Sequence, residues 1–104
     1  MSVISIYAIF ADAEEAERIG RAVVEDRLAA CVNILGPVRS IYRWRGDVQS
    51  ADEVAAIFKT TADLVDRLMT RIAGLHSYEV PCVVASPVDK LLGSYAQWVE
   101  DSVG

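Results

Sequence analysis

Hydrophobic residues run through residues 3–10, VISIYAIF, with almost no polar alternation. β-Branched and aromatic side chains in such a run are typical of a central strand that is buried on both faces. Later segments show shorter hydrophobic runs with Gly or Pro at their borders, as strands do. A second strand is predicted over residues 28–35 and resumes over residues 40–46, a third covers 53–60, and a fourth covers 80–88 and is closed by Pro87.

The middle of the chain predicts a long hairpin. Gly36-Pro37 breaks or bends the second strand, and Gly46-Asp47 is the expected turn into the third strand. Between these two points the side chains alternate strictly, which is typical of extended chain. Ser40, Tyr42 and Trp44 share one face, and Ile41, Arg43 and Arg45 share the other.

Helices are predicted between the strands. Asp12 and Glu15 have the D-x-x-E spacing of a capping box, so we expect a helix from Asp12 that ends near Arg27. Apolar residues then recur at helical spacing in both this segment and a later one. That later helix is predicted to begin at Thr61 or Asp63 and to end at Gly74, and a short third helix is predicted to be capped by Ser94 and Gln97.

The order of these elements is β-α-β-β-α-β followed by a short helix. This order predicts an α+β domain of the ferredoxin-like type, with strands one and three in the centre and both long helices on one face. The second strand then lies at an edge, although it carries Ile41, Tyr42 and Trp44. An apolar edge strand invites pairing with another chain, so we expect a closed homo-oligomer.

Length and composition narrow the function classes. The 104 residues fit one domain, residues 1–104, and the hydrophobic share of 53% exceeds that of an average soluble domain, which again favours packing between subunits. With 15 acidic and 10 basic residues, the chain would repel a phosphate backbone, so nucleic acid is not an expected partner. We find no apolar stretch of membrane-spanning length and no signal peptide, and therefore expect a cytoplasmic protein. Cys31 and Cys82 are expected to be buried free thiols.

Five segments together resemble the CutA family of divalent-cation tolerance proteins. They are LAACVNI, SIYRW-G, E-----KT, HSYEVP and Y--W, in this order along essentially the whole chain. The resemblance implies a ferredoxin-like homotrimer whose long hairpins pack around a three-fold axis, and a link to copper and other divalent ions. It also implies a polar and aromatic pocket between subunits. The residues that match the motifs and would line this pocket are Cys31, Trp44, Glu53, Lys59, Tyr78, Tyr95 and Trp98.

His76 is the candidate metal ligand. Imidazole is a good ligand for copper and zinc, and copper is the metal expected before zinc. The resemblance also implies a first-strand cysteine and a second histidine, which have been proposed as copper ligands in family members. Those positions hold Ala8 and Leu75 in this chain, which leaves His76. The alternative is that His76 ends the second helix and interacts with the negative end of its dipole.

The remaining candidates also have structural alternatives. Cys31 is either a buried thiol or a ligand whose thiolate is stabilised by Lys59 on the paired strand. Glu53 and Lys59 either bind a small anionic or polar ligand or form an ion pair that orders the oligomer. Trp44 is expected to be an interface anchor.

The edge strand predicts an oligomer, and the resemblance to the CutA family implies that it is a homotrimer that binds divalent metal ions and needs no cofactor. The alternatives are a small-ligand sensor with a pocket between subunits, or a purely structural trimer. An enzyme is not predicted, because no catalytic triad, phosphate-binding loop or paired catalytic carboxylates can be recognised.

Overall fold

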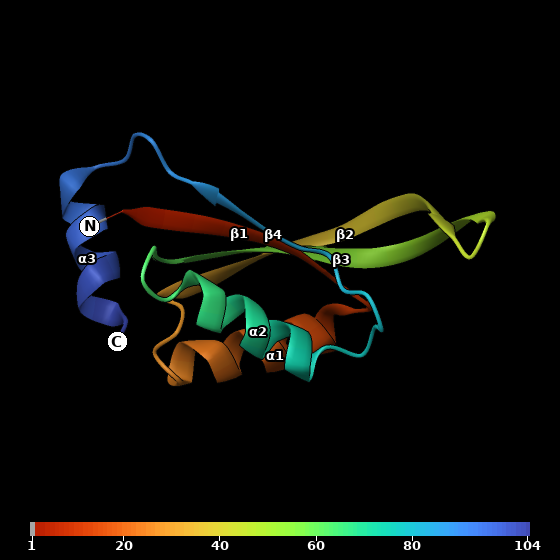
Figure 1. The fold of residues 1–104 in the computed structure, drawn as a ribbon, viewed down its shortest axis with the longest axis horizontal. Coiled ribbons are helices and arrows are strands. Elements are labelled where there is room, and N and C mark those ends of the chain that lie inside the picture. Colours follow the sequence, from red (N-terminus) through yellow and green to blue (C-terminus); the bar gives the residue numbers. More distant parts are fainter. Residues whose placement is uncertain (1) are drawn as a thin grey trace.

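The elements of the computed structural model, which describes residues 2–104, follow the predicted order. Figure 1 shows a layer of two helices below a twisted sheet, with a long hairpin extending beyond both. This hairpin gives the molecule its extents of 44 × 25 × 22 Å. The elements are β1 (Val3–Phe10), α1 (Ala13–Glu25), β2 (Cys31–Trp44), β3 (Asp47–Thr61), α2 (Val65–Leu75), β4 (Val83–Pro87) and α3 (Gly93–Ser102).

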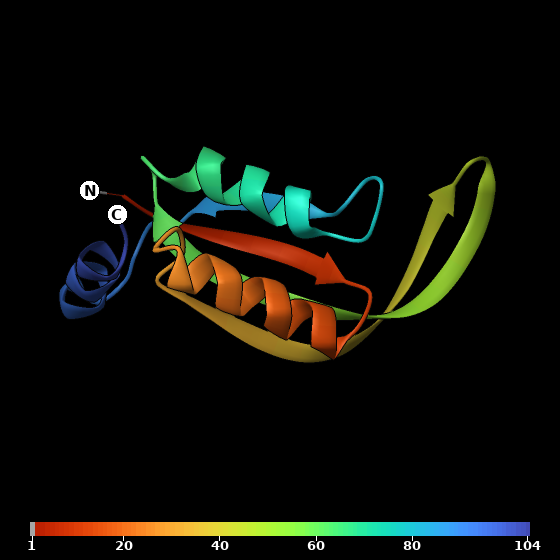
Figure 2. The same cartoon turned by 90° about the horizontal axis from the view of Figure 1, so that it is seen from below.

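The sheet is antiparallel and has the strand order β2-β3-β1-β4. The two central strands are β1 and β3, as predicted, and they pair from Val3↔Thr61 to Phe10↔Val54. Figures 1 and 2 show that α1 and α2 lie side by side on one face of this sheet. The α+β fold and the edge position of the second strand are therefore confirmed.

The core lies between the sheet and the two long helices. Phe10 and Phe58 on the central strands, Ile19 on α1, and Leu68 and Ile72 on α2 are fully buried there. Helix α1 begins as predicted, because the Asp12 side chain accepts a hydrogen bond from the backbone N–H of Glu15 at 2.8 Å.

The opposite face of the sheet, called the open face here, is covered only at one end. Tyr7 on β1 lies beside Ile57 on β3 and Val84 on β4, and Tyr7 and Val84 are 40% and 56% exposed. At the end of the sheet where β1 begins, α3 packs on a separate small cluster that contains Val3 and Val99. Apolar side chains in the middle of the open face therefore have no cover from any helix within residues 2–104.

The hairpin differs from the prediction in two ways. First, β2 is one continuous strand from Cys31 to Trp44, and Gly36-Pro37 does not break it. A β-bulge between Ile34 and Gly36 absorbs the irregularity, and Gly36 has the positive φ of 109° that glycine adopts without strain. Second, Trp44 pairs with Asp47, so the turn consists of Arg45 and Gly46.

Both turn residues have positive φ, 50° for Arg45 and 87° for Gly46. Two consecutive left-handed residues are the requirement of a type I′ hairpin turn, whose twist matches that of the strands. The predicted turn at Gly46-Asp47 was thus one residue late.

Other boundaries also differ from the prediction. Helix α2 begins at Val65 without a side-chain cap and continues through Gly74, and α3 begins after Leu92, not at a Ser94 cap. Strand β4 begins at Val83. The expectation of two buried thiols is wrong for Cys82, which is exposed before this strand, and holds only in part for Cys31, which is partly buried. No helix within residues 2–104 is long and apolar enough to cross a membrane.

Candidate functional site

His76 ends helix α2 and its ring is completely buried. It is the C-cap residue, with an extended backbone that leads into the loop of residues 77–82. The imidazole stacks on Phe10 with ring centroids 5.2 Å apart, and its side chain has 0% exposure. His76 therefore ends the second helix, as the alternative reading of the sequence predicted. Its ring, however, is buried inside the protein.

Both ring nitrogens of His76 have hydrogen-bond partners. Nδ1 accepts from the backbone N–H of Tyr78 at 3.0 Å, so Nε2 carries the hydrogen and donates to the carbonyl oxygen of Ile9 at 2.7 Å. A metal ion bound to this imidazole would have to replace one of these partners. The ring instead connects the end of α2 to the end of β1.

Glu15 holds the same loop from α1. One carboxylate oxygen accepts from the backbone N–H of Ala11 at 3.0 Å, and the other accepts from the N–H of Ser77 at 2.9 Å. Burial by itself would raise the pKa of Glu15, but the hydrogen bonds from Ser77 and Ala11, with His76 nearby, lower this pKa below its ordinary value. Glu15 is therefore an ionised, buried anchor.

Tyr78 and Glu53 join the loop to the hairpin. The Tyr78 hydroxyl donates to a Glu53 carboxylate oxygen at 2.6 Å, and Glu53 is buried. Burial and the bond to Glu53 raise the pKa of Tyr78 well above its ordinary value, so the hydroxyl stays protonated. The side chains of Glu15, Glu53, His76, Ser77 and Tyr78 form one continuous region, called the His76 cluster below.

A second cluster lies at the other end of the sheet. The Cys31 thiol and the Tyr95 hydroxyl are 3.4 Å apart, and the Tyr95 and Trp98 rings lie 5.6 Å apart on α3. Lys59 is the register partner of Cys31 on β3. The bond to Cys31, followed by burial, raises the pKa of Tyr95 to about 12. We call Cys31, Lys59, Tyr95 and Trp98 the Cys31 cluster.

One chain does not bring the seven predicted pocket residues together. Glu53 and Tyr78 belong to the His76 cluster, whereas Cys31, Lys59, Tyr95 and Trp98 form the other. Glu53 and Lys59 are six residues apart on β3, which is roughly 20 Å at about 3.3 Å per strand residue. Trp44 lies at the hairpin tip, where the Arg45 guanidinium is 5.3 Å from its ring centroid. Within residues 2–104, no group of three or more His, Cys, Asp and Glu residues is placed to hold a metal ion.

The sequence did not predict that Glu15 binds the loop of residues 77–82, nor that Arg45 forms an ion pair with Glu79. The capping-box spacing predicted that the Glu15 carboxylate accepts a hydrogen bond from the backbone just before α1. The donor is the N–H of Ala11 and not that of Asp12. The bond of Glu15 to Ser77 spans 62 positions, and the ion pair of Arg45 with Glu79, at 3.1 Å, spans the hairpin and the loop. Neither contact leaves a periodic signal in the sequence.

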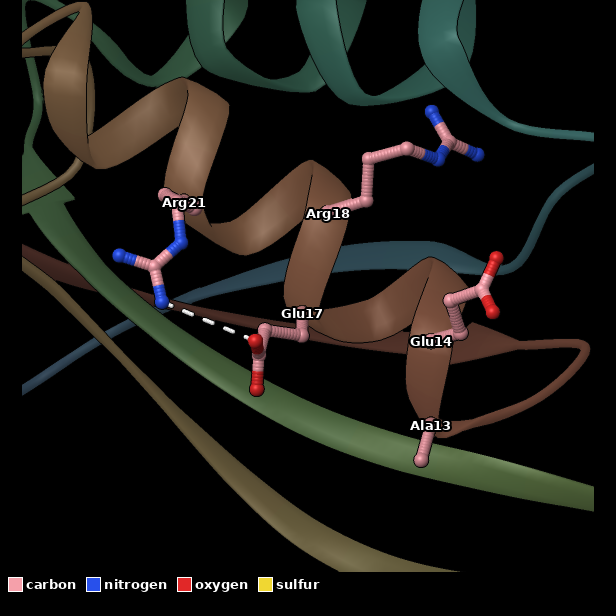
Figure 3. A pocket seen from close by; sticks show the side chains of 5 residues that line it. All are labelled: Ala13, Glu14, Glu17, Arg18 and Arg21. Atoms are coloured by element: carbon pink, nitrogen blue, oxygen red, sulfur yellow. Dashed lines mark ion pairs between the residues drawn. The ribbon is translucent and has the colours of Figure 1, made fainter.

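A surface hollow beside α1 contains none of the predicted residues. Figure 3 shows that charged side chains line it, and Arg21 pairs with Glu17 at 3.6 Å. Both partners are more than 65% exposed, so water screens the pair and the hollow has no buried polar group to fix a ligand. A second hollow lies between Leu28 and the exposed side of α2.

Comparison with known proteins gives one consistent result. Residues 4–102 match the family model described as CutA1 divalent ion tolerance protein. The divalent-cation tolerance protein CutA of Thermus thermophilus is 42% identical over 88% of both chains. The protein CutA of Homo sapiens is 41% identical over 94% of this chain, which spans 55% of the human protein.

Solved structures agree over the whole fold. The CutA structure from Xylella fastidiosa has a TM-score of 0.96 at 35% identity, with 100% of both chains covered. The structure of an Archaeoglobus fulgidus protein, described as a periplasmic divalent cation tolerance protein CutA, has a TM-score of 0.94 at 35% identity and covers 98% of this chain and 99% of that one.

Proposed function

Because the chain belongs to the CutA1 divalent ion tolerance family, we propose that it acts as a homotrimer that binds divalent metal ions, copper foremost, between its subunits. Its relatives are named tolerance proteins and not enzymes. The proposal concerns the assembly, the metal and the place of binding, which go beyond family membership.

The observation that supports assembly most directly is the uncovered open face. Tyr7 and Val84 are exposed there. On the hairpin, Tyr42 and Trp44 pair with Gln49 and Asp47 and so lie on the same side of the sheet as Ile57, and they are 39% and 37% exposed. The hairpin strands extend beyond the helical layer, so no helix of the described residues 2–104 covers their far end (Figure 2). Large exposed apolar surface marks protein interfaces. A second and third copy would cover it.

Assembly would also complete the divided pocket. The Cys31 cluster offers a thiol, an ammonium group and two aromatic rings, and the other cluster offers the buried Glu53 carboxylate. These groups lie roughly 20 Å apart along β3 at about 3.3 Å per strand residue, so they can meet only if one copy contributes the first group and its neighbour contributes the second. Thiolate is a soft ligand and imidazole suits copper, so Cys31 and His76 are the residues whose chemistry fits copper.

Two measurements test this proposal. Light scattering should give about three times the chain mass of 11.4 kDa, and a monomeric mass would contradict the assembly. Calorimetric titration with Cu(II) of the wild type, His76→Ala and Cys31→Ser should show affinity lost in the variant that lacks a ligand. Equal affinity in all three would exclude both residues as ligands, and absence of heat in the wild type would exclude copper binding.

The alternative of a small-ligand sensor is favoured by one observation. Trp98 is 46% exposed beside Tyr95, and Lys59 lies on the strand next to Cys31. An ammonium group on the strand that carries the partner of Cys31 suits a small anionic molecule. A ligand that binds only the folded state raises the melting temperature, so a thermal-shift panel of anionic metabolites on the wild type and Lys59→Met separates this alternative from copper binding.

The cellular location stays a prediction. We expect the cytoplasm, but the relatives differ, since one is described as periplasmic and another, from Arabidopsis thaliana, as chloroplastic. Detection of a fusion protein in separated cell fractions would test the expectation.

A further inference from the structure

The open face carries opposite charges on one strand. Side chains of odd-numbered β3 residues lie on the same side of the sheet as Ile57, which is the open face. Three charged residues in the strands of the described chain, residues 2–104, lie on this side, namely Asp47, Glu53 and Lys59. Lys59 is therefore the one cation that these strands direct to the open face.

The Glu53 carboxylate is buried without a cation beside it. Glu53 is 8% exposed, and the hydroxyl of Tyr78 donates to its Oε2 atom at 2.6 Å. None of the ion pairs within residues 2–104 includes Glu53. One neutral donor offsets only part of the cost of removing a carboxylate from water, so this group is suited to a further, cationic partner.

Lys59 has the complementary need. It is partly buried, and its register partners are Cys31 on β2 and Ser5 on β1, neither of which supplies a carboxylate. No hydrogen bond or ion pair engages its ammonium group in the part of the chain that the structure describes. Glu53 lies roughly 20 Å away along β3, at about 3.3 Å per strand residue, which is farther than the two extended side chains reach. The two charges therefore do not pair within one copy.

Both charges become costly when another copy covers the open face. The neighbouring copy would remove the water that solvates the Lys59 ammonium group and the second oxygen of Glu53. An unpaired charge inside an interface is strongly destabilising, whereas a pair with a further hydrogen bond recovers much of this cost. Because every copy presents both groups, each copy can contribute the cation to one neighbour and the carboxylate to the other around a closed ring.

Asp47 is the other carboxylate on this side of the sheet, but the structure favours Glu53. Asp47 pairs with Trp44 at the hairpin tip and is exposed, so water solvates its charge without a cation. Glu53 is buried, and its carboxylate is already oriented by Tyr78. A group that is fixed before association loses less conformational entropy when it pairs.

We propose that Lys59 of one copy forms an ion pair with Glu53 of the partner subunit, and that Tyr78 positions this carboxylate. The ion pair rests on the proposed assembly, and it fixes which part of one copy meets which part of the next. It also engages the Lys59 ammonium group in assembly, so an anionic ligand of the sensor alternative would have to compete with a carboxylate.

Charge reversal tests the ion pair. Lys59→Glu and Glu53→Lys each place like charges opposite one another, so we expect the concentration at which the assembly dissociates in light scattering to rise roughly a hundredfold. The double variant Lys59→Glu/Glu53→Lys restores opposite charges between copies and should regain the wild-type value. Such a rescue cannot arise within one chain, because the two positions lie too far apart. Arg67→Glu is the control, since it makes the same change of charge at an exposed position of α2.

Neutral variants decide the question if circular dichroism shows that a reversed charge prevents folding. Lys59→Met and Glu53→Gln each remove one charge, and the amide oxygen that replaces the carboxylate still accepts from Tyr78. Each change alone should weaken assembly. The two together should weaken it by less than the product of the separate effects, because the second change removes a charge that has already lost its partner.

The outcomes distinguish the ion pair from the assembly. A monomeric wild type would contradict the assembly and the ion pair with it. An assembled wild type whose single reversals dissociate no more readily, or whose double variant is not restored, would overturn the ion pair and leave the assembly standing. So would neutral changes whose effects simply multiply. Rescue of Lys59→Glu by Asp47→Lys in place of Glu53→Lys would show that Lys59 meets the hairpin tip.

Discussion

At the scale of single residues, His76 shows which part of a role can be inferred from sequence. Its position at the end of a helical pattern predicted a helix end, and this is confirmed. Its hydrogen bond to the carbonyl of Ile9 spans 67 positions, and its stacking on Phe10 is equally distant in sequence. Such contacts are set by tertiary packing, and one sequence contains no periodic trace of them. The metal-binding role of His76 stays a prediction.

The same cluster makes Glu15 a sensitive residue. Glu15→Gln keeps one carbonyl acceptor but replaces the second acceptor by an N–H₂ group, which leaves the N–H of Ala11 or of Ser77 without a partner. We expect a loss of about 1–3 kcal/mol in unfolding free energy, measured by urea denaturation at pH 7. Glu17→Gln is the control, since Glu17 is 68% exposed and should change stability by less than about 0.5 kcal/mol.

The way in which the unfolding free energies of the wild type and of Glu15→Gln depend on pH is a separate prediction. The folded-state pKa of Glu15 lies below its ordinary value, so its ionised form stabilises the fold above that value. This contribution is lost as the pH falls through the folded-state pKa. The stability gap between wild type and Glu15→Gln should therefore narrow on acidification below the ordinary glutamate range, whereas a gap that is constant down to acid unfolding would show that Glu15 acts through packing and not through its charge.

At the scale of elements, hydrophobic periodicity predicted which segments form strands and helices but not where they meet. The β-bulge after Ile34 inserts one residue into β2, so Ile34 shares a side of the sheet with Ala56, while Gly36 pairs with Ala55. Even-numbered residues therefore change sides at the bulge. The alternation over residues 40–44 correctly predicted an extended chain. Nothing in the local sequence, however, indicated which of the two sides of this strand faces the helices.

Helical glycines give a matched prediction at this scale. A Cβ on Gly20 of α1 would lie 2.8 Å from Cγ1 of Val32 on β2, whereas a Cβ on Gly74 of α2 would meet nothing within 4 Å. We expect Gly20→Ala to destabilise the protein by about 1–3 kcal/mol through overpacking. Gly74→Ala should stabilise it by about 0.5–1 kcal/mol because alanine favours the helix. Thermal denaturation of both variants checks this, and equal effects would mean that the contact of α1 with β2 yields easily.

At the scale of the whole molecule, topology was the most predictable property. A right-handed crossover rule and one unalternating strand were enough to place β1 and β3 in the centre. The sequence did not predict that the candidate pocket residues fall into two separate clusters. Residue spacing along β3 shows which side of the strand a residue lies on, but it does not give its distance to groups on α3 or on the loop of residues 77–82. An open face followed from the prediction that both long helices lie on one face, but which side chains it exposes, among them Tyr7 and Val84, required the structure.

The open face also decides how assembly can be tested without disturbing the fold. Val84 is 56% exposed on the short edge strand β4, so in a single copy Val84→Lys should change stability by less than about 0.5 kcal/mol. If other copies cover this face, the same change places a charge in an apolar interface, and the particle mass should fall toward that of one chain. Ala73→Lys adds the same charge to the exposed surface of α2 and should leave the mass unchanged. Light scattering at several concentrations distinguishes the two variants. If Val84→Lys keeps the wild-type mass, the middle of the open face lies outside the interface, and assembly would have to proceed through the hairpin alone.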